Sequence, residues 1–178
     1  WATLLGIGVK SGIDLPNEKQ GLVPSTQWKR ERMKEKWYAG ETISVSIGQG
    51  AVAATPIQMA RAFGAIATGG HMVRPHVTNP TDLPPGVVQA SNVPDQATIP
   101  IDPKNWEIIT DAMAQVVSPV GTAALSQIKG IDIAGKTGSA QTISNMLKAK
   151  MSAAEKAEHK DNGWFVGVEP RRNPEIVV

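Results

Sequence analysis

Two stretches of the chain repeat their apolar positions with the period of an α-helix. In residues 55–68 and 102–117 the apolar side chains recur every three or four residues, at Ile57, Ala60, Phe63, Gly64 and Ala67 and at Trp106, Ile109, Met113, Val116 and Val117. Each stretch opens with a good N-cap residue followed by proline, Thr55-Pro56 and Asp102-Pro103. We therefore predict a helix over each stretch, and Gly69-Gly70 should end the first one.

Alternating apolar and polar positions near the C-terminus predict strands instead. One candidate covers residues 131–142, where Ile131 and Ile133 alternate with polar neighbours. A second covers residues 163–170, and a turn at 171–174 leads into a third at 175–178. This order of elements, a strand, an excursion, a strand, a tight turn and a strand, favours an antiparallel sheet with helices packed on one face. The expected fold class is α+β.

The other segments carry weaker patterns. We expect a helix tail in 1–10, a short extended piece in 11–16 and a solvated helix in 27–38. Residues 41–50 alternate and should be extended until the sharp turn at Gly48-Gln49-Gly50. We further expect short strands within 71–101, a short helix capped by Thr122 in 122–127 and a partly helical excursion in 143–162.

Composition narrows the function classes. The 178 residues suffice for one domain with a core, and the net charge of +2 is too small to indicate a nucleic-acid partner. Cysteine is absent, so there is neither a disulfide framework nor a thiolate site. No apolar run has the length of a membrane span and no signal peptide is visible. The chain starts at Trp1 without an initiator Met and stops within the strand expected at 175–178. We therefore expect it to be a piece of a longer protein.

Residues 130–142 carry the candidate chemistry, and two motifs compete for them. Gly130, Gly135, Lys136 and Thr137 match the phosphate-binding pattern G-x-x-x-x-G-K-[ST]. Lys136-Thr137-Gly138 also matches the K-T-G element of penicillin-binding proteins and serine β-lactamases. A phosphate loop needs a strand before its first glycine and a helix opening at the lysine, whereas here the apolar alternation falls inside the supposed loop. The context favours K-T-G, and a nucleotide-binding protein stays as the alternative.

Two further patterns look like chemistry but are expected to be coincidental. Ser126 and Lys129 form the chain's one S-x-x-K, in which a serine nucleophile and a lysine base are spaced for a shared helix face. They lie so close before Lys136 that we interpret the match as a chance one, and no S-x-N occurs anywhere. His71 and His76 could suggest a metal site, but with no cysteine and few carboxylates nearby we expect surface histidines.

Several separated stretches, taken together and in order, resemble the transpeptidase domain of class B penicillin-binding proteins of the elongation type. The stretches are Trp37-Tyr38-Ala39-Gly40-Glu41-Thr42, Ser46-Ile47-Gly48-Gln49-Gly50, Ala54-Thr55-Pro56-Ile57-Gln58-Met59-Ala60, Gly121-Thr122-Ala123, Ala134-Gly135-Lys136-Thr137-Gly138-Ser139-Ala140-Gln141 and Trp164-Phe165-Val166-Gly167. The resemblance covers the whole chain. It implies the penicillin-binding fold and places residues 1–178 in the C-terminal portion of one transpeptidase domain, with S-x-x-K and S-x-N in an upstream part.

The resemblance also implies roles for residues of the K-T-G strand. Lys136 is the expected catalytic residue, supplying positive charge and hydrogen bonding at the active-site hydroxyls. Thr137 and Ser139 are expected to bind the carboxylate of the substrate or antibiotic, beside the side-chain-free Gly138. The backbone of Ser139 and Gln141 should pair with an extended ligand, and one of these two amides should form part of the oxyanion hole.

For the parent protein, the resemblance implies a membrane-anchored serine D,D-transpeptidase of the bacterial periplasm, without a cofactor. Its expected partners are peptidoglycan stem peptides ending in D-Ala-D-Ala, β-lactams, the upstream part of the same domain and a membrane-embedded glycan polymerase. A catalytically inactive penicillin-fold domain used for binding stays as a further alternative. Because the two missing motifs lie elsewhere, these 178 residues by themselves should be inactive.

Overall fold

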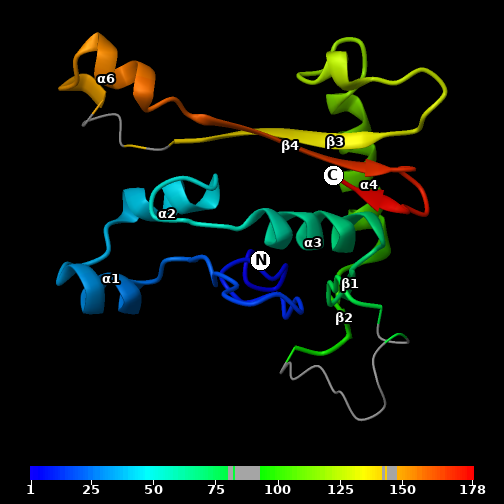
Figure 1. Ribbon diagram of the computed structural model, residues 1–178, viewed down its shortest axis with the longest axis horizontal. Helices are drawn as coiled ribbons and strands as arrows, with labels where there is room; N and C mark the ends of the chain where they lie inside the picture. The colour runs from blue at the N-terminus through cyan, green and yellow to red at the C-terminus, as the bar shows by residue number, and fades with distance from the viewer. Residues whose placement is uncertain (80–81, 83–92, 142, 144–147) are drawn as a thin grey trace.

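A three-stranded antiparallel sheet forms the centre of the C-terminal half (Figure 1). The computed structural model describes residues 1–79, 82, 93–141, 143 and 148–178. Strand β3 (Ala134–Ala140) pairs with β4 (Asn162–Glu169), which pairs on its other side with the short β5 (Ile176–Val177). The expected order of strand, excursion, strand, turn and strand is confirmed, and helix α6 (Ala153–Glu158) lies in the excursion.

The two helices predicted from periodicity and caps pack on this sheet. Helix α3 (Pro56–Ala67) begins at Thr55, whose hydroxyl accepts from Gln58 N, and helix α4 (Pro103–Val116) begins at Asp102. The cross-strand pair Ala134 and Val168 is fully buried against side chains of both helices, with Met113 of α4 at the centre. In Figure 1, α3 runs below the strands and α4 behind them.

The buried face of α3 differs from the predicted one, whereas for α4 the predicted Trp106, Met113 and Val117 are buried. In α3 the buried residues are Gln58, Ala62 and Ala65, and the predicted apolar stripe is only half-buried. In α4, Ile109 is exposed and Thr110 is buried. Polar groups enter the core here because their hydrogen bonds are satisfied: the Thr110 hydroxyl donates to the Trp106 carbonyl at 3.0 Å.

The N-terminal third forms two short helices and a series of turns. Helix α1 (Thr26–Met33) confirms the helix expected in 27–38, although it is shorter, while residues 1–8 form turns instead of a helix tail and 11–16 contain no strand. The extended segment predicted for 41–50 is wrong, because helix α2 (Ala39–Ser46) occupies most of it. The sharp turn at Gly48-Gln49-Gly50 is present, with both glycines at φ near +70° (+73° and +72°).

An ion pair between a buried lysine and a half-buried glutamate explains why residues 39–46 are helical. Lys29 of α1 is only 4% exposed, and its Nζ donates to Glu41 Oε1 at 2.6 Å. The other Glu41 oxygen accepts from Tyr38 N at 2.7 Å, closing the first turn of α2. Glu41 therefore caps α2 and joins it to α1, and this tertiary contact overrides the alternating sequence pattern.

A two-stranded ribbon lies beside the N-terminal end of α4. Strand β1 (His71–Val73) pairs antiparallel with β2 (Gln96–Thr98), which confirms short strands within 71–101. His71 and His76 are both exposed. In the described part of the chain, no cluster of three or more potential metal-ligating side chains occurs.

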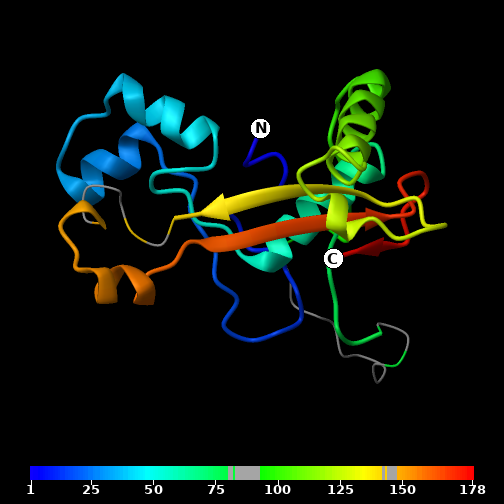
Figure 2. The ribbon, with the colours of Figure 1, turned by 90° about the horizontal axis from the view of Figure 1, so that it is seen from above.

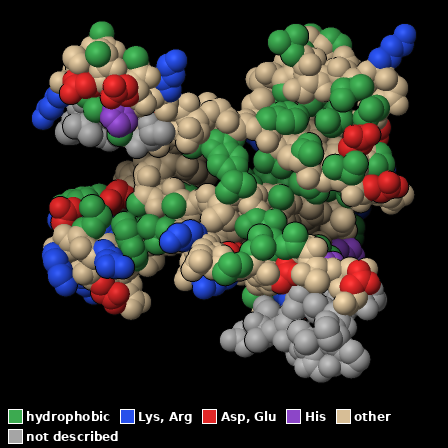
Figure 3. Space-filling model, viewed as in Figure 1, with side chains coloured by type: hydrophobic (Ala, Val, Ile, Leu, Met, Phe, Trp, Pro, Cys, Tyr) green, Lys and Arg blue, Asp and Glu red, His purple; other side chains and the backbone are tan. Residues whose placement is uncertain are grey.

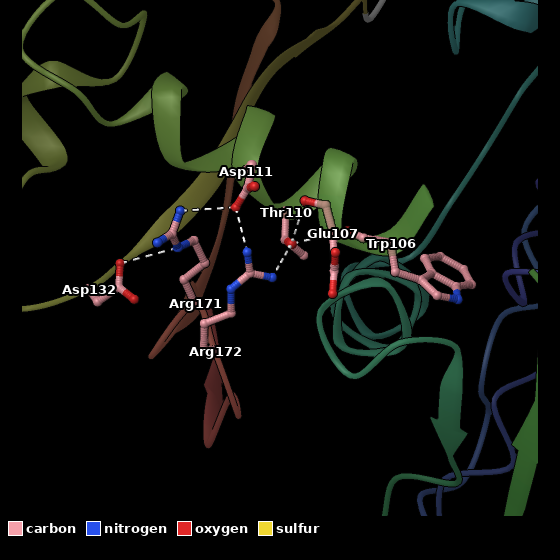
Figure 4. Close-up of polar contacts among 7 residues, drawn as sticks. All are labelled: Trp106, Glu107, Thr110, Asp111, Asp132, Arg171 and Arg172. Carbon is pink, nitrogen blue, oxygen red and sulfur yellow. Dashed lines mark hydrogen bonds and ion pairs between the residues drawn. The ribbon is translucent and has the colours of Figure 1, made fainter. Parts of the chain in front are cut away.

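The turn between β4 and β5 is tied to α4 and to the segment entering β3. Asp111 of α4 accepts from Arg171 Nη1 at 3.1 Å and from Arg172 Nη2 at 2.7 Å (Figure 4). Arg171 also donates its backbone N–H to the Asp132 carbonyl at 2.6 Å, and its Nε lies 3.4 Å from the Asp132 carboxylate. These contacts fix the start of β3 against α4.

The surface is uneven in charge. Figure 3 shows Lys and Arg side chains gathered at the corner that holds α1, interleaved with carboxylates. The mixture matches a solvated helix better than a polyanion site. Among the described residues, no helix combines the length and the apolar character needed to cross a bilayer.

Candidate active site

Strand β3 is an edge strand, and four of the five predicted site residues lie on it. Lys136, Thr137, Gly138 and Ser139 lie between its middle and its end, and the fifth residue, Gln141, follows directly after Ala140. Within the described residues β3 pairs with β4 alone, so its other edge is unpaired. Figure 2 shows the C-terminal end of β3 extending past α3 toward the α1 and α2 end of the molecule.

The register of the β3–β4 pair assigns the site side chains to two faces. Thr137 and Ser139 share one face with Phe165, which is the cross-strand partner of Thr137. Lys136 lies on the opposite face with its partner Val166, on the side where Ala134 is buried against the helices. The lysine and the hydroxyls therefore flank the unpaired edge from opposite faces.

Lys136 is exposed and its ammonium reaches the unpaired edge. The Nζ atom donates to the Thr137 carbonyl at 2.6 Å. Because backbone groups of alternate residues point to the same side of a strand, the Thr137 and Ser139 carbonyls and N–H groups face away from β4. An extended ligand paired with this edge would meet the Lys136 charge directly.

Gln49 also contacts this edge, a role that the sequence pattern did not reveal. Its Nε2 donates to the Ser139 carbonyl at 3.2 Å across 90 residues of sequence. The Gly48-Gln49-Gly50 turn presents it, since both glycines adopt a left-handed backbone conformation that other residues rarely take. The turn after α2 thus forms one boundary of the edge at Ser139.

Thr122 contributes a second unpredicted contact. Its Oγ1 lies 3.0 Å from Thr137 Oγ1. Thr122 does not cap the predicted short helix, which is reduced to a single 3₁₀ turn, η2 (Ala124–Ser126), with Ala123 as its first flanking residue. The structure therefore brings a loop hydroxyl to a site hydroxyl 15 residues away.

The geometry contradicts the phosphate-loop alternative. Gly135, Lys136 and Thr137 lie in the middle of β3, and no helix opens at the lysine. The backbone amides of a phosphate loop converge on one point, whereas those of a strand point alternately to its two sides. The Ser126–Lys129 pair also lacks the helix that a serine and its base would share, because the 3₁₀ turn ends at Ser126 and Gln127 is extended. The two side chains share no helix face.

Comparison with known proteins decides the family. The model of the penicillin-binding protein transpeptidase domain matches residues 1–178. The chain belongs to the penicillin-binding protein transpeptidase family. The predicted fold class and the predicted family are both confirmed, and β3 carries the sequence Lys136-Thr137-Gly138.

Individual relatives agree with this family. The peptidoglycan D,D-transpeptidase MrdA of Acinetobacter baumannii is 40% identical over the whole chain. The structure of Pseudomonas aeruginosa PBP2 in complex with WCK 5153 is 34% identical with a TM-score of 0.77, over 99% of this chain and 36% of that one. The complex of PBP2 and MreC from Helicobacter pylori gives 30% and 0.76, over 98% of this chain and 29% of that one. The chain described here spans about a quarter (26%) of the A. baumannii relative.

Proposed function

We propose that these residues are the C-terminal portion of the transpeptidase domain of a peptidoglycan D,D-transpeptidase of the penicillin-binding protein 2 type. The observation that carries this is the K-T-G sequence on an unpaired strand edge, with Lys136 on one face and Thr137 and Ser139 on the other. In the reaction, a serine attacks the carbonyl of the penultimate D-Ala, the terminal D-Ala leaves, and an amine takes the acyl group from the serine. The serine and its base lie outside residues 1–178.

In this proposal each site residue acts on an extended ligand along β3. The hydroxyls of Thr137 and Ser139 bind the ligand carboxylate, while Gly138, on the opposite face, adds no side chain beside Lys136. The Lys136 ammonium supplies positive charge and hydrogen bonds to the active-site hydroxyls. An amide of Ser139 or Gln141 donates to the oxyanion, and the Ser139 backbone faces the unpaired edge of β3.

The proposed partners follow from this activity and from the named relatives. They are D-Ala-D-Ala stem peptides, β-lactams, the upstream part of the same domain and a membrane-embedded glycan polymerase of the elongation machinery. The proposed location is the periplasmic face of the bacterial inner membrane, with the anchor outside these residues. The H. pylori relative, which forms a complex with MreC, supports partners in the cell-wall machinery.

The test is covalent labelling of the intact protein that contains these residues. After incubation with benzylpenicillin, we expect a single adduct on a serine outside residues 1–178, found by mass spectrometry of its peptides. Incubation with a D-Ala-D-Ala stem peptide and an acceptor amine should release D-Ala and give the cross-linked product. Neither adduct nor product from folded protein would instead favour an inactive penicillin-fold binding domain.

A further inference from the structure

The loop that follows α4 is held in one position by the end of that helix. Ala123 is buried, and its N–H donates to the Val116 carbonyl at 2.8 Å, while Gly121 N donates to the Ser118 carbonyl at 2.8 Å. The carbonyls at a helix C-terminus have no partners within the helix, and this loop supplies one. Residues 118–123 are therefore fixed by backbone bonds that do not involve the Thr122 side chain.

Gly121 makes this close approach possible. A Cβ atom at position 121 would lie 2.1 Å from the Val116 carbonyl oxygen and 2.3 Å from that of Gln115. Any other residue would push the loop away from the helix. Met113 of α4 packs in turn against Ala134 at the start of β3, so helix, loop and strand form one unit. The Oγ1 atoms of Thr122 and Thr137 meet at 3.0 Å as a consequence.

Either hydroxyl of this pair could donate the hydrogen bond to the other, but a bound anion would favour one of the two directions. Each hydroxyl has one proton and can accept two hydrogen bonds. If Thr137 donates to Thr122, it has no proton left for a ligand carboxylate. If Thr122 donates to Thr137, the Thr137 proton is free to point outward, and the first bond strengthens the second.

We propose that Thr122 is a positioning residue that donates its hydroxyl proton to Thr137 and so turns the Thr137 proton toward the ligand carboxylate. The inference rests on the proposed function, which places a carboxylate at Thr137 and Ser139. Thr122 itself touches no ligand in this proposal. It acts on binding of the carboxylate and leaves the acylation chemistry to other groups.

The test compares Thr122→Val with Thr122→Ser in the intact protein. Valine keeps the shape of threonine without a hydroxyl, and serine keeps the hydroxyl. Acylation by benzylpenicillin is followed over a range of concentrations to separate its apparent dissociation constant from its limiting rate. For Thr122→Val we expect the dissociation constant to rise about three- to tenfold, the range for one lost hydrogen bond, with the limiting rate within about twofold. Thr122→Ser should stay close to wild type.

Three controls make the result specific. Thr3→Val removes an exposed hydroxyl far along the chain and should change nothing. The methyl ester of penicillin lacks the carboxylate, so Thr122→Val and wild type should react with it alike. In a double-mutant cycle, Thr122→Val should add little once Thr137→Val is present. This cycle keeps the proposal testable even if one single variant is less stable.

The other outcomes are also decisive. An unchanged dissociation constant in Thr122→Val overturns the inference while the proposed function stands. A lower melting temperature with equal losses of binding and rate, not restored by serine, assigns Thr122 to loop structure and also overturns it. Wild-type protein that forms no penicillin adduct contradicts the proposed function itself, before Thr122 is in question.

Discussion

The ring of Phe165 lies directly over Gly135 on the Thr137 face of the sheet. A Cβ atom at position 135 would come within 2.7 Å of Phe165 Cζ and 3.0 Å of the Val166 carbonyl oxygen. The glycine before the K-T-G element is therefore required by an aromatic side chain on the neighbouring strand. Two separated motifs of the sequence, at 134–141 and 164–167, meet in this contact.

Gly135→Ala should consequently destabilise the protein. The added methyl group forces the Phe165 ring or the β4 backbone to move, which costs about 1–3 kcal/mol for overpacking of this kind. Denaturant unfolding measures the change. Gly163→Ala is the matched control on the same pair of strands, because a Cβ there has no neighbour within 4 Å. Equal stabilities of the two variants would refute the close contact.

Gln58 is the polar centre of the N-terminal packing. It is 1% exposed, and its Nε2 donates to the Val9 carbonyl at 2.6 Å and to the Gln20 carbonyl at 2.7 Å. Gln58→Leu should destabilise the protein by about 1–3 kcal/mol, because it removes both hydrogen bonds that the buried amide donates. Gln115→Leu, on the exposed face of α4, is the control and should be close to neutral. A Gln58→Leu protein as stable as wild type would show that the two carbonyls find other partners.

Glu41 gives the stability of the α1–α2 pair a dependence on pH. The hydrogen bond from Lys29 Nζ, followed by that from Tyr38 N, lowers the pKa of the Glu41 carboxyl below its ordinary value of 4.5. A carboxyl whose pKa is lower in the folded than in the unfolded state stabilises the fold above the ordinary pKa. This stabilisation is lost as pH falls below 4.5 toward the folded-state pKa.

Glu41→Gln should therefore reduce the loss of stability between neutral and acidic pH. The measurement is denaturant unfolding of wild type and variant at a series of pH values from neutral to acid. We expect the variant to be less stable at neutral pH and the difference to shrink below pH 4.5. Glu107→Gln, on an exposed residue of α4, provides the control. Parallel curves for wild type and Glu41→Gln would contradict the role of the ion pair.

The helix starts and the α2 segment show which parts of the fold could be predicted from the sequence. Thr55-Pro56 and Asp102-Pro103 mark helix starts through local capping, so α3 and α4 were predictable. The alternation in 41–50 predicted a strand, but Ile43 and Ile47 are 68% and 71% exposed, so no buried face lies behind the pattern. The helix there depends on Lys29, which is 12 residues from Glu41.

The residues of the candidate site also include some that the sequence could predict and some that it could not. Lys136, Thr137, Gly138 and Ser139 could be found because they are contiguous and their order matches a known motif. Gln49 and Thr122 could not be assigned their contacts, since these join turns and loops to β3 across long stretches of sequence. Ile131 and Ile133 suggested the strand correctly, yet they lie before it, where the chain is held by Arg171.

The last prediction separates the proposed catalytic lysine from the accidental one. Lys136 is exposed and makes no ion pair among the described residues, so its side chain contributes little to folding. In the intact protein, Lys136→Ala should lower the rate of acylation by benzylpenicillin about a hundredfold or more, the range for removal of an electrostatic or acid–base group. Its melting temperature should stay close to that of wild type.

Lys129→Ala and Ser126→Ala are the matched controls, because they remove both members of the chance S-x-x-K. Neither should change the acylation rate, since the extended backbone after Ser126 keeps the two side chains from sharing a helix face. Rates come from the time course of labelling with a fluorescent penicillin, and melting is followed on the same samples. Loss of labelling in Ser126→Ala would place the nucleophile inside these residues and contradict the proposal. A Lys136→Ala protein that melts early, yet acylates normally when folded, would show that this lysine serves the fold instead of the reaction.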